Sequence, residues 1–295
     1  MSLNFMLYNN SQFFINFSII HINRIDGSSV FFCIGNILKK ESPFQSYFSP
    51  VSLNATFEIL KSCGVYFKTP KRDVAMYCYG SSITASQFPK YIKDGKHSML
   101  PRPYEKSKPG KPGYELLQSD WFSDIIRKIE FAVIYFLENF HPERKDAQNM
   151  LAKIRLSKIK IPKELRIGDS FFTHMMFMGS MDKGSEVPIH FDEKDIVTAL
   201  FHFGSVQEGG MTEYFDGLSV KNPGNVQKQI PFKNGRLQIG SYSSILHKAT
   251  AYKGTRGTLN FNLKQTVLDH FLKEGNKFFN QYKMCGFPQG TFYAS

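Results

Sequence analysis

The chain has 295 residues, of which 42% are hydrophobic and 15% aromatic, so it holds enough apolar material for a large core and is not a disordered chain. Lysine and arginine exceed aspartate and glutamate by 37 to 25, a formal charge of +12, which favours polyanionic partners, nucleic acid before anionic membranes. Its four cysteines are widely spaced without a C-x-x-C pair, which argues against a cysteine zinc site and a disulfide framework.

For residues 1–115 we predict a basic N-terminal extension that packs on the core. Apolar stretches such as 30–34 and 65–67 alternate there with polar loops. The first 20 residues lack the basic start and the small-residue cleavage site of a signal peptide. No run of about 18 apolar residues follows, so we expect an intracellular protein without a membrane partner. We also expect the protein to be nuclear.

A long basic loop is predicted over residues 91–113. Six lysines and arginines are mixed there with four prolines and several glycines, residue types that oppose regular structure. Tyr91, Tyr104 and Tyr114 lie in or beside this loop, so it could contact phosphates and bases. A solvated run of charges is the alternative.

Two predicted helices follow, and after them the spacing of apolar residues changes from helical to every second residue. Residues 120–140 predict a helix, because Asp120 can cap it, apolar residues recur at helical spacing and Pro142 closes it. A second helix is predicted from Pro142 to about Leu151. From Lys153 to Ile161 basic and apolar residues alternate, which predicts a strand.

Short strands separated by turn residues fill the next hundred residues, and a helix is predicted at 265–279. Such spacing is typical of an all-β sandwich or barrel. The predicted strands lie at 170–178, 189–203, 211–215, 236–239, 244–247 and 256–263.

Two histidines and an aspartate in this β region suggest a metal site. We expect a strand to begin at His190-Phe191-Asp192, so that His190 and Asp192, two residues apart, face the same side. His247, 55 residues after Asp192, is expected to end another strand. Two imidazoles and one carboxylate are the ligand set of non-haem Fe(II) oxygenases, so all three are the predicted metal ligands and catalytic residues.

Arg256 supports this interpretation, because residues 256–263 alternate cleanly. Arg256, Thr258 and Asn260 face one side of the predicted strand, and a guanidinium directed into a barrel needs a bound carboxylate. These three are the predicted cofactor-binding residues, with Arg256 on the distal carboxylate of 2-oxoglutarate. His174 is added as a residue that touches substrate or cosubstrate.

Each of these residues alone has an ordinary structural explanation. A single histidine is more often on the surface or satisfied in a core, Asp192 could belong to an acidic turn, and Arg256 could pair with a surface acid. His202 is interpreted as lining or core and not as a ligand. The order, strand context and shared facing of the residues favour the iron site.

Residues 188–264 resemble the TET/JBP group of 2-oxoglutarate/Fe(II) dioxygenases, which oxidise methyl groups on pyrimidines in DNA. The resemblance covers about a quarter of the chain, and its His-x-Asp, His and Arg elements are common to the whole oxygenase superfamily. The elements that carry it are Pro188-Ile189-His190-Phe191-Asp192, Leu200-Phe201-His202-Phe203-Gly204, Gly209-Gly210-Met211-Thr212-Glu213-Tyr214-Phe215, His247-Lys248-Ala249 and Gly254-Thr255-Arg256.

The resemblance implies an α+β, mainly β fold with a double-stranded β-helix (jelly-roll, cupin-like) core at about 150–266. This core would lie in a dioxygenase domain over 116–295, with helix 120–140 as a buttress. The implied activity is oxidation of 5-methylcytosine or thymine in DNA, with Fe(II) and 2-oxoglutarate as cofactors and the 153–166 run on phosphates. Two alternatives stay open: an oxygenase that hydroxylates protein or RNA, and a non-catalytic jelly-roll binding module.

Overall fold

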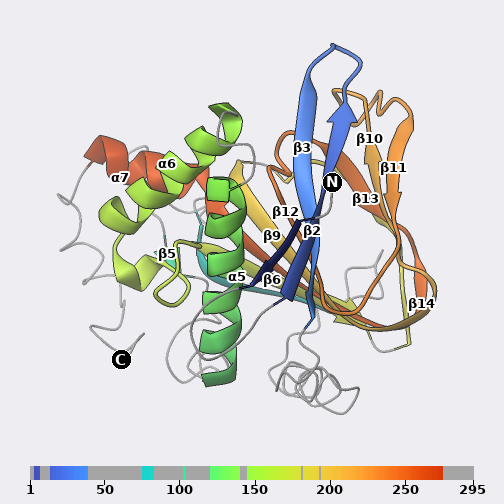
Figure 1. The fold of residues 1–295 in the computed structure, drawn as a ribbon, viewed down its shortest axis with the longest axis horizontal. Helices are drawn as coiled ribbons and strands as arrows, with labels where there is room; N and C mark the ends of the chain where they lie inside the picture. The colour runs from blue at the N-terminus through green and yellow to red at the C-terminus, as the bar shows by residue number, and fades with distance from the viewer. Residues whose placement is uncertain are drawn as a thin grey trace, which may run out of the picture. The chain divides into compact units, whose positions relative to one another are not determined.

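The computed structural model describes residues 3–6, 14–38, 75–82, 102–103, 120–139, 145–180, 182–192 and 194–274 (Figure 1). The chain divides into two compact units, Met1–Tyr77 with Met176–Asn260, and Cys78–Met175 with Phe261–Ser295. Nearly all of the predicted 91–113 loop lies outside the described residues, and the domain boundary near residue 115 stays a prediction. Within the described ranges, no helix combines the length and apolar character needed to cross a bilayer.

Eight described strands build a double-stranded β-helix. The chain passes back and forth between two sheets, a large one that contains the order β12-β9-β14-β6 and a small one with the order β11-β10-β13-β8. This interleaved order confirms the predicted mainly-β jelly roll. The strands are β6 (His174–Ser180), β8 (Val187–His190), β9 (Asp195–Gly209), β10 (Thr212–Phe215), β11 (Val226–Ile230), β12 (Arg236–Gly240), β13 (Leu246–Ala249) and β14 (Tyr252–Lys264).

The N-terminal residues extend the large sheet. β1 (Leu3–Met6), β2 (Phe14–Asn23) and β3 (Ser29–Leu38) are antiparallel neighbours, and β3 pairs with β12. In Figure 1 the β2–β3 hairpin stands beside β12 and projects past it. A two-residue strand, β7 (Lys183–Gly184), pairs with β14.

The space between the two sheets of the first unit is filled from both sides. Tyr214 of β10 and Ile230 of β11 come from the small sheet, and Leu200 of β9 comes from the large one. Tyr242 and Ile245, from the loop between β12 and β13, complete this cluster. The side chains that share these inward faces therefore project into one common interior.

The second unit is mostly helical. It contains α5 (Asp120–Asn139), α6 (Lys145–Lys160), the short η3 (Lys163–Leu165), α7 (Gln265–Glu274) and most of β4 (Ala75–Ser82), which pairs with β5 (Arg102–Pro103). The predicted helix at 120–140 is confirmed. Its buried face includes Phe122, whose ring lies 6.2 Å from that of Phe261, which in turn lies 5.4 Å from Phe172.

Some predicted elements were wrong. The strand expected at 153–161 is the second half of α6, because Ile154 and Ser157 are buried at helical spacing while Ile159 is 76% exposed. Lysine and arginine are good helix formers, so the short alternation did not outweigh the helix. The single strand expected at 189–203 is two strands, β8 and β9, on different sheets. β11 was not predicted.

Candidate metal centre

The small sheet brings the predicted metal ligands to one of its ends. His190, the last residue of β8, lies opposite His247, the second residue of β13. β10 runs antiparallel to β13 and ends at Phe215, so β8 and β10 end and β13 begins at this same end, which we call the site end. Asp192 follows β8 in the loop to β9. The expectations that a strand begins at the H-x-D motif and that His247 ends one were therefore wrong.

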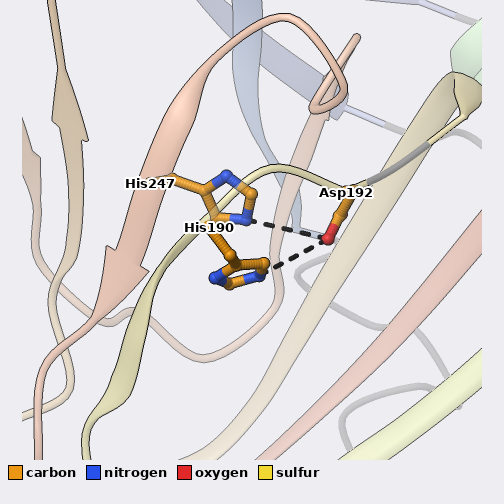
Figure 2. Close-up of side chains that lie close together, drawn as sticks. All are labelled: His190, Asp192 and His247. Atoms are coloured by element: carbon orange, nitrogen blue, oxygen red, sulfur yellow. Dashed lines mark ion pairs between the residues drawn. The ribbon is translucent and has the colours of Figure 1, made fainter. Parts of the chain in front are cut away.

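The three side chains nevertheless converge. Nε2 of His190 lies 3.5 Å from Oδ1 of Asp192, and Nε2 of His247 lies 3.9 Å from the same oxygen (Figure 2). The candidate ligand atoms all lie within 4.8 Å of one another. Metal–ligand bonds of about 2.0–2.2 Å place neighbouring ligand atoms about 3–4 Å apart. The spacing therefore fits one ion held by both imidazoles and the carboxylate.

Backbone carbonyls set the orientation of both imidazoles. Nδ1 of His190 lies 2.7 Å from the carbonyl oxygen of Pro188, and Nδ1 of His247 lies 3.1 Å from that of Ile245. A carbonyl oxygen only accepts, so each Nδ1 carries the proton and donates it. In its neutral form each ring then presents the Nε2 lone pair on the side of Asp192, as metal-binding histidines do.

The protonation state of His247 also suits a ligand. Burial lowers the pKa of His247 to about 4, although the nearby Asp192 carboxylate opposes this shift. At neutral pH the ring is therefore uncharged, which is the form that binds a metal without first releasing a proton. His190 is more accessible, with 38% of its side chain exposed against 7% for His247.

Tyr242 supports two of the three ligands. Its carbonyl oxygen accepts a hydrogen bond of 3.1 Å from the Asp192 amide, and its ring stands edge-on to His247 with centroids 4.9 Å apart. Its hydroxyl lies 2.8 Å from that of Tyr214 and donates to Oε1 of Gln238 at 2.9 Å. Burial, with a smaller effect of Asp192, raises the pKa of Tyr214, so its hydroxyl stays protonated in this buried network.

Arg256 is a buried cation on β14. It is 6% exposed, and no carboxylate of the described residues lies within the 4.0 Å ion-pair distance of it. Its guanidinium carbon lies 5.4 Å from the ring centroid of Tyr252 and 5.8 Å from that of Phe232. Burial lowers the pKa of Arg256, yet an arginine keeps its charge in proteins. A buried cation in this state suits an anionic ligand.

Two neighbours of Arg256 on β14 face the same interior. Thr258 Oγ1 lies 3.3 Å from Nδ1 of His202 on β9, and alternation places Arg256, Thr258 and Asn260 on one face, as predicted. Nε2 of His202 and Oδ1 of Asn260 are buried, and neither has a hydrogen-bond partner among the described residues. Burial, followed by the charges of Arg256 and Arg236, lowers the pKa of His202 well below its usual range, so this ring is neutral.

His174 belongs to the second unit. It is buried at the start of β6, where its Nδ1 lies 3.1 Å from Oδ1 of Asn262. Its predicted contact with substrate or cosubstrate stays a prediction. The roles assigned to His190, Asp192 and His247 as ligands also stay predictions, although their positions fit.

Sequence reasoning overlooked the residues that support the site. Tyr214, Tyr242 and Gln238, which were given no role, form its hydrogen-bonded network. His202, which was interpreted as lining or core, also contributes a polar atom beside Arg256. The one available signal was Gln238, a polar residue between Leu237 and Ile239 in β12. Tyr242 lies in a loop with no periodicity, so its contacts with Asp192 and His247 could not be foreseen.

Comparison with solved structures finds oxygenases at low similarity. One is NgTET1 in complex with 5mC DNA, with 15% identity, a TM-score of 0.47, and coverage of 82% of this chain and 75% of that one. A prolyl-4-hydroxylase of Pseudomonas putida has 18% identity and a TM-score of 0.25, covering 31% and 48%. A prolyl hydroxylase of Trichoplax adhaerens has 16% identity and a TM-score of 0.27, covering 35% and 50%.

The chain thus spans about half of either prolyl hydroxylase. No protein-family model matches the sequence, and no curated protein matches it.

Proposed function

We propose that the protein is an Fe(II)- and 2-oxoglutarate-dependent dioxygenase. The observation that carries this proposal is the convergence of His190, Asp192 and His247 at the site end of a double-stranded β-helix. Two imidazoles and one carboxylate are the ligand set typical of non-haem Fe(II) oxygenases, and they leave other positions of the ion open. A closed four-ligand site would instead point to structural zinc.

The surroundings fit both cofactors. Both Nε2 atoms face a carboxylate, which suits a divalent cation, and the buried Arg256 without an acid partner in the described part of the chain suits a carboxylate ligand. Thr258 and Asn260, on the same strand face, would add hydrogen bonds to that carboxylate, and Nε2 of His202 is also available. These groups bind and orient, and the apolar rings around Arg256 exclude water from its charge.

Fe(II) and 2-oxoglutarate together supply the chemistry in which O₂ and 2-oxoglutarate become CO₂ and succinate while a substrate C–H bond becomes C–OH. Tyr242 holds Asp192 and His247 in place during turnover through its carbonyl oxygen and its ring. Because the rings of His190 and His247 donate from Nδ1 to fixed carbonyls, neither has to reorient to bind the ion.

We propose the methyl group of 5-methylcytosine or thymine in DNA as the substrate. The sequence resemblance at 188–264 and the net charge of +12 support this choice. A base in a duplex would have to be flipped out of the stack to reach the metal. A DNA substrate is consistent with the nuclear location that we expect. The alternatives are a protein or RNA hydroxylase and a non-catalytic module.

Succinate formation tests the enzyme. The wild-type protein with Fe(II), 2-oxoglutarate and O₂ is expected to form succinate, and His190→Ala and Asp192→Ala are expected to form none. Lys248→Met is the matched control, because Lys248 follows His247 but pairs with Glu186 and Glu213 instead of the ligands. Succinate production that is unchanged in both triad variants would rule out the iron assignment.

The substrate needs a separate assay. Methylated duplex DNA is incubated with the enzyme and its cofactors, and the nucleosides are then measured by mass spectrometry. We expect loss of 5-methylcytosine or thymine with gain of the hydroxymethyl product. If both bases stay intact while 2-oxoglutarate is consumed, the enzyme is an oxygenase with a different substrate.

A further inference from the structure

The strand register connects the candidate metal ligands to a lysine at the edge of the small sheet. His190, His247, Tyr214 and Lys228 are consecutive partners across β8, β13, β10 and β11. Residues directly opposite one another in a sheet project from the same face. With strands about 4.8 Å apart, the Lys228 backbone lies roughly 10 Å from that of His247. Lys228 therefore shares the face of the ligands and is exposed.

Two further exposed lysines lie in loops at the site end. Lys194 comes two residues after Asp192 and has a φ of 62°, an uncommon conformation for a residue other than glycine. The residue after Lys194, Asp195, is held in place because its carbonyl oxygen accepts a hydrogen bond of 2.7 Å from Ser243 Oγ. Lys221 lies in the loop at 216–225, which follows the end of β10.

These three lysines differ in their pairing from Arg155, Lys158 and Lys163 of α6 and η3. Among the described residues, no carboxylate lies within 4.0 Å of Lys194, Lys221 or Lys228. The run at 153–166 was expected to bind phosphates, which stays a prediction, and three of its basic side chains already pair with acids. The pairs there are Arg155–Glu138 at 3.0 Å, Lys158–Glu130 at 2.8 Å and Lys163–Asp169 at 2.6 Å.

The loop that carries Lys221 is held in shape by Asp216. Its buried carboxylate accepts hydrogen bonds from the Asn225 amide at 2.6 Å and from Nε2 of Gln227 at 2.7 Å. The Gly217 amide also donates to the carbonyl oxygen of Pro223 at 2.8 Å. A loop ordered before binding loses less conformational entropy when a partner arrives.

Apolar side chains accompany the lysines. Leu218 is 40% exposed and Val220 is 54% exposed on the same loop. Ile25 of the β2–β3 turn is 57% exposed, and its amide donates to the carbonyl oxygen of Asp216 at 3.1 Å. Apolar side chains next to cations suit a nucleic acid, where they can contact sugars and unstacked bases while the cations contact phosphates.

We propose that Lys194, Lys221 and Lys228 form the surface that binds the phosphate backbone of duplex DNA beside the metal centre. This inference rests on the proposed function for its choice of DNA. The positive charge of the surface, which no acid pairs with in the described part of the chain, complements phosphate. The position of the surface lets bound DNA present a flipped base to the site end. The paired residues of α6 and η3 contribute little to this binding.

Salt-dependent DNA binding tests the proposal. Fluorescence anisotropy of a short labelled duplex with one 5-methylcytosine is followed as salt rises from about 50 to about 200 mM. The triple variant Lys194→Gln, Lys221→Gln, Lys228→Gln is compared with Arg155→Gln, Lys158→Gln, Lys163→Gln, which removes the same charge. Three lost phosphate contacts, at about 0.9 each, make the slope of log affinity against log salt shallower by about 2.7. Between the two salt concentrations the affinity of the triple variant therefore falls by about 40-fold less than that of the wild type. The control is expected to keep the wild-type slope.

Several results would overturn the surface. One is a control that loses slope while the triple variant keeps it. Another is a triple variant that loses binding to anionic lipid vesicles or to duplex RNA but not to DNA. Wild-type protein that binds no duplex at low salt would overturn both this surface and the DNA substrate. Succinate formation would then still decide separately on the Fe(II)/2-oxoglutarate centre.

Single substitutions keep the test decisive if the triple variant folds poorly. Each Lys→Gln change alone is expected to lower the salt slope by about 1. Lysine on an edge strand also blocks pairing with other sheets, so light scattering is recorded for Lys228→Gln. An unchanged slope in all three single variants, with circular dichroism like that of the wild type, contradicts the proposal.

Discussion

Replacing Arg256 with methionine tests whether this buried cation binds a ligand or stabilises the fold. Arg256 is 6% exposed, and no acid in the described part of the chain pairs with it. Even a buried ion pair can often be replaced by apolar residues of similar volume with a neutral or stabilising effect of about 1–4 kcal/mol, and a buried charge without an acid partner has no Coulomb attraction to lose. Arg256→Met should therefore leave the melting temperature of the ligand-free protein unchanged or raise it.

The same variant should lose its response to 2-oxoglutarate. A ligand at 100 times its Kd stabilises the folded state by about 2.7 kcal/mol, which for a chain of this size raises the melting temperature by about 5 °C. Differential scanning fluorimetry with Fe(II) under anaerobic conditions, with and without 2-oxoglutarate, measures this shift. We expect the full shift in the wild type and almost none in Arg256→Met.

Lys253→Met is the matched control on the same strand. Lys253 is 70% exposed and pairs with Glu208 at 2.6 Å, so its loss should leave the 2-oxoglutarate shift intact. Two results would refute the reasoning on Arg256. One is a full shift in Arg256→Met, and the other is a ligand-free variant that is destabilised by about 3–5 kcal/mol, the cost of breaking a buried ion pair.

Three further predictions follow from the same interior. Asp192→Asn should weaken Mn(II) binding by about 100-fold or more in calorimetric titration, because it removes the charge of a proposed direct ligand; unchanged affinity would contradict this. The pKa of His202 is lowered by burial and then by nearby arginines, so the unfolded chain binds the proton first and stability falls as pH drops below about 6.5. Urea unfolding at about pH 7 and about pH 5 should show a smaller loss in His202→Gln, and an equal loss would contradict the assignment. Gly204→Ala should cost about 2–6 kcal/mol in urea unfolding, since φ is +128° and the added Cβ would lie 2.2 Å from the Thr255 carbonyl oxygen; wild-type stability would be the contrary result.

The sequence predicted the fold class wherever periodicity was long. The helix at 120–140 and the strand at 256–263 were found because each repeats its pattern over several turns or residue pairs. The alternation at 153–161 led to a wrong strand prediction, because so few residues fit both the strand period of two and the helical period of 3.6. Ile154 and Ser157, three residues apart, are buried on one face of the helix in the second unit. β11 was missed because its residues are almost all exposed and polar, so no apolar alternation marks it.

His190, Asp192 and His247 converge as predicted, but the contacts that bring them together differ in part from those expected. His190 and Asp192 do not share a strand face, since β8 ends at His190. They approach because the Asp192 amide bonds to the Tyr242 carbonyl, a contact between loops that no local pattern encodes. Arg256 was placed correctly on an inward face, because its strand alternates along its length. Residues brought together by loops, such as Tyr242, become visible only in three dimensions.

Fe(II) binding to the triad tests the central claim most directly. Equilibrium dialysis under anaerobic conditions measures iron bound per chain in the wild type, in Asp192→Ala, in His247→Ala and in the control Lys248→Met. We predict about one Fe(II) per chain in the wild type and the control, and none in the two triad variants, as a three-ligand site requires. Iron bound equally by all four proteins would contradict the claim.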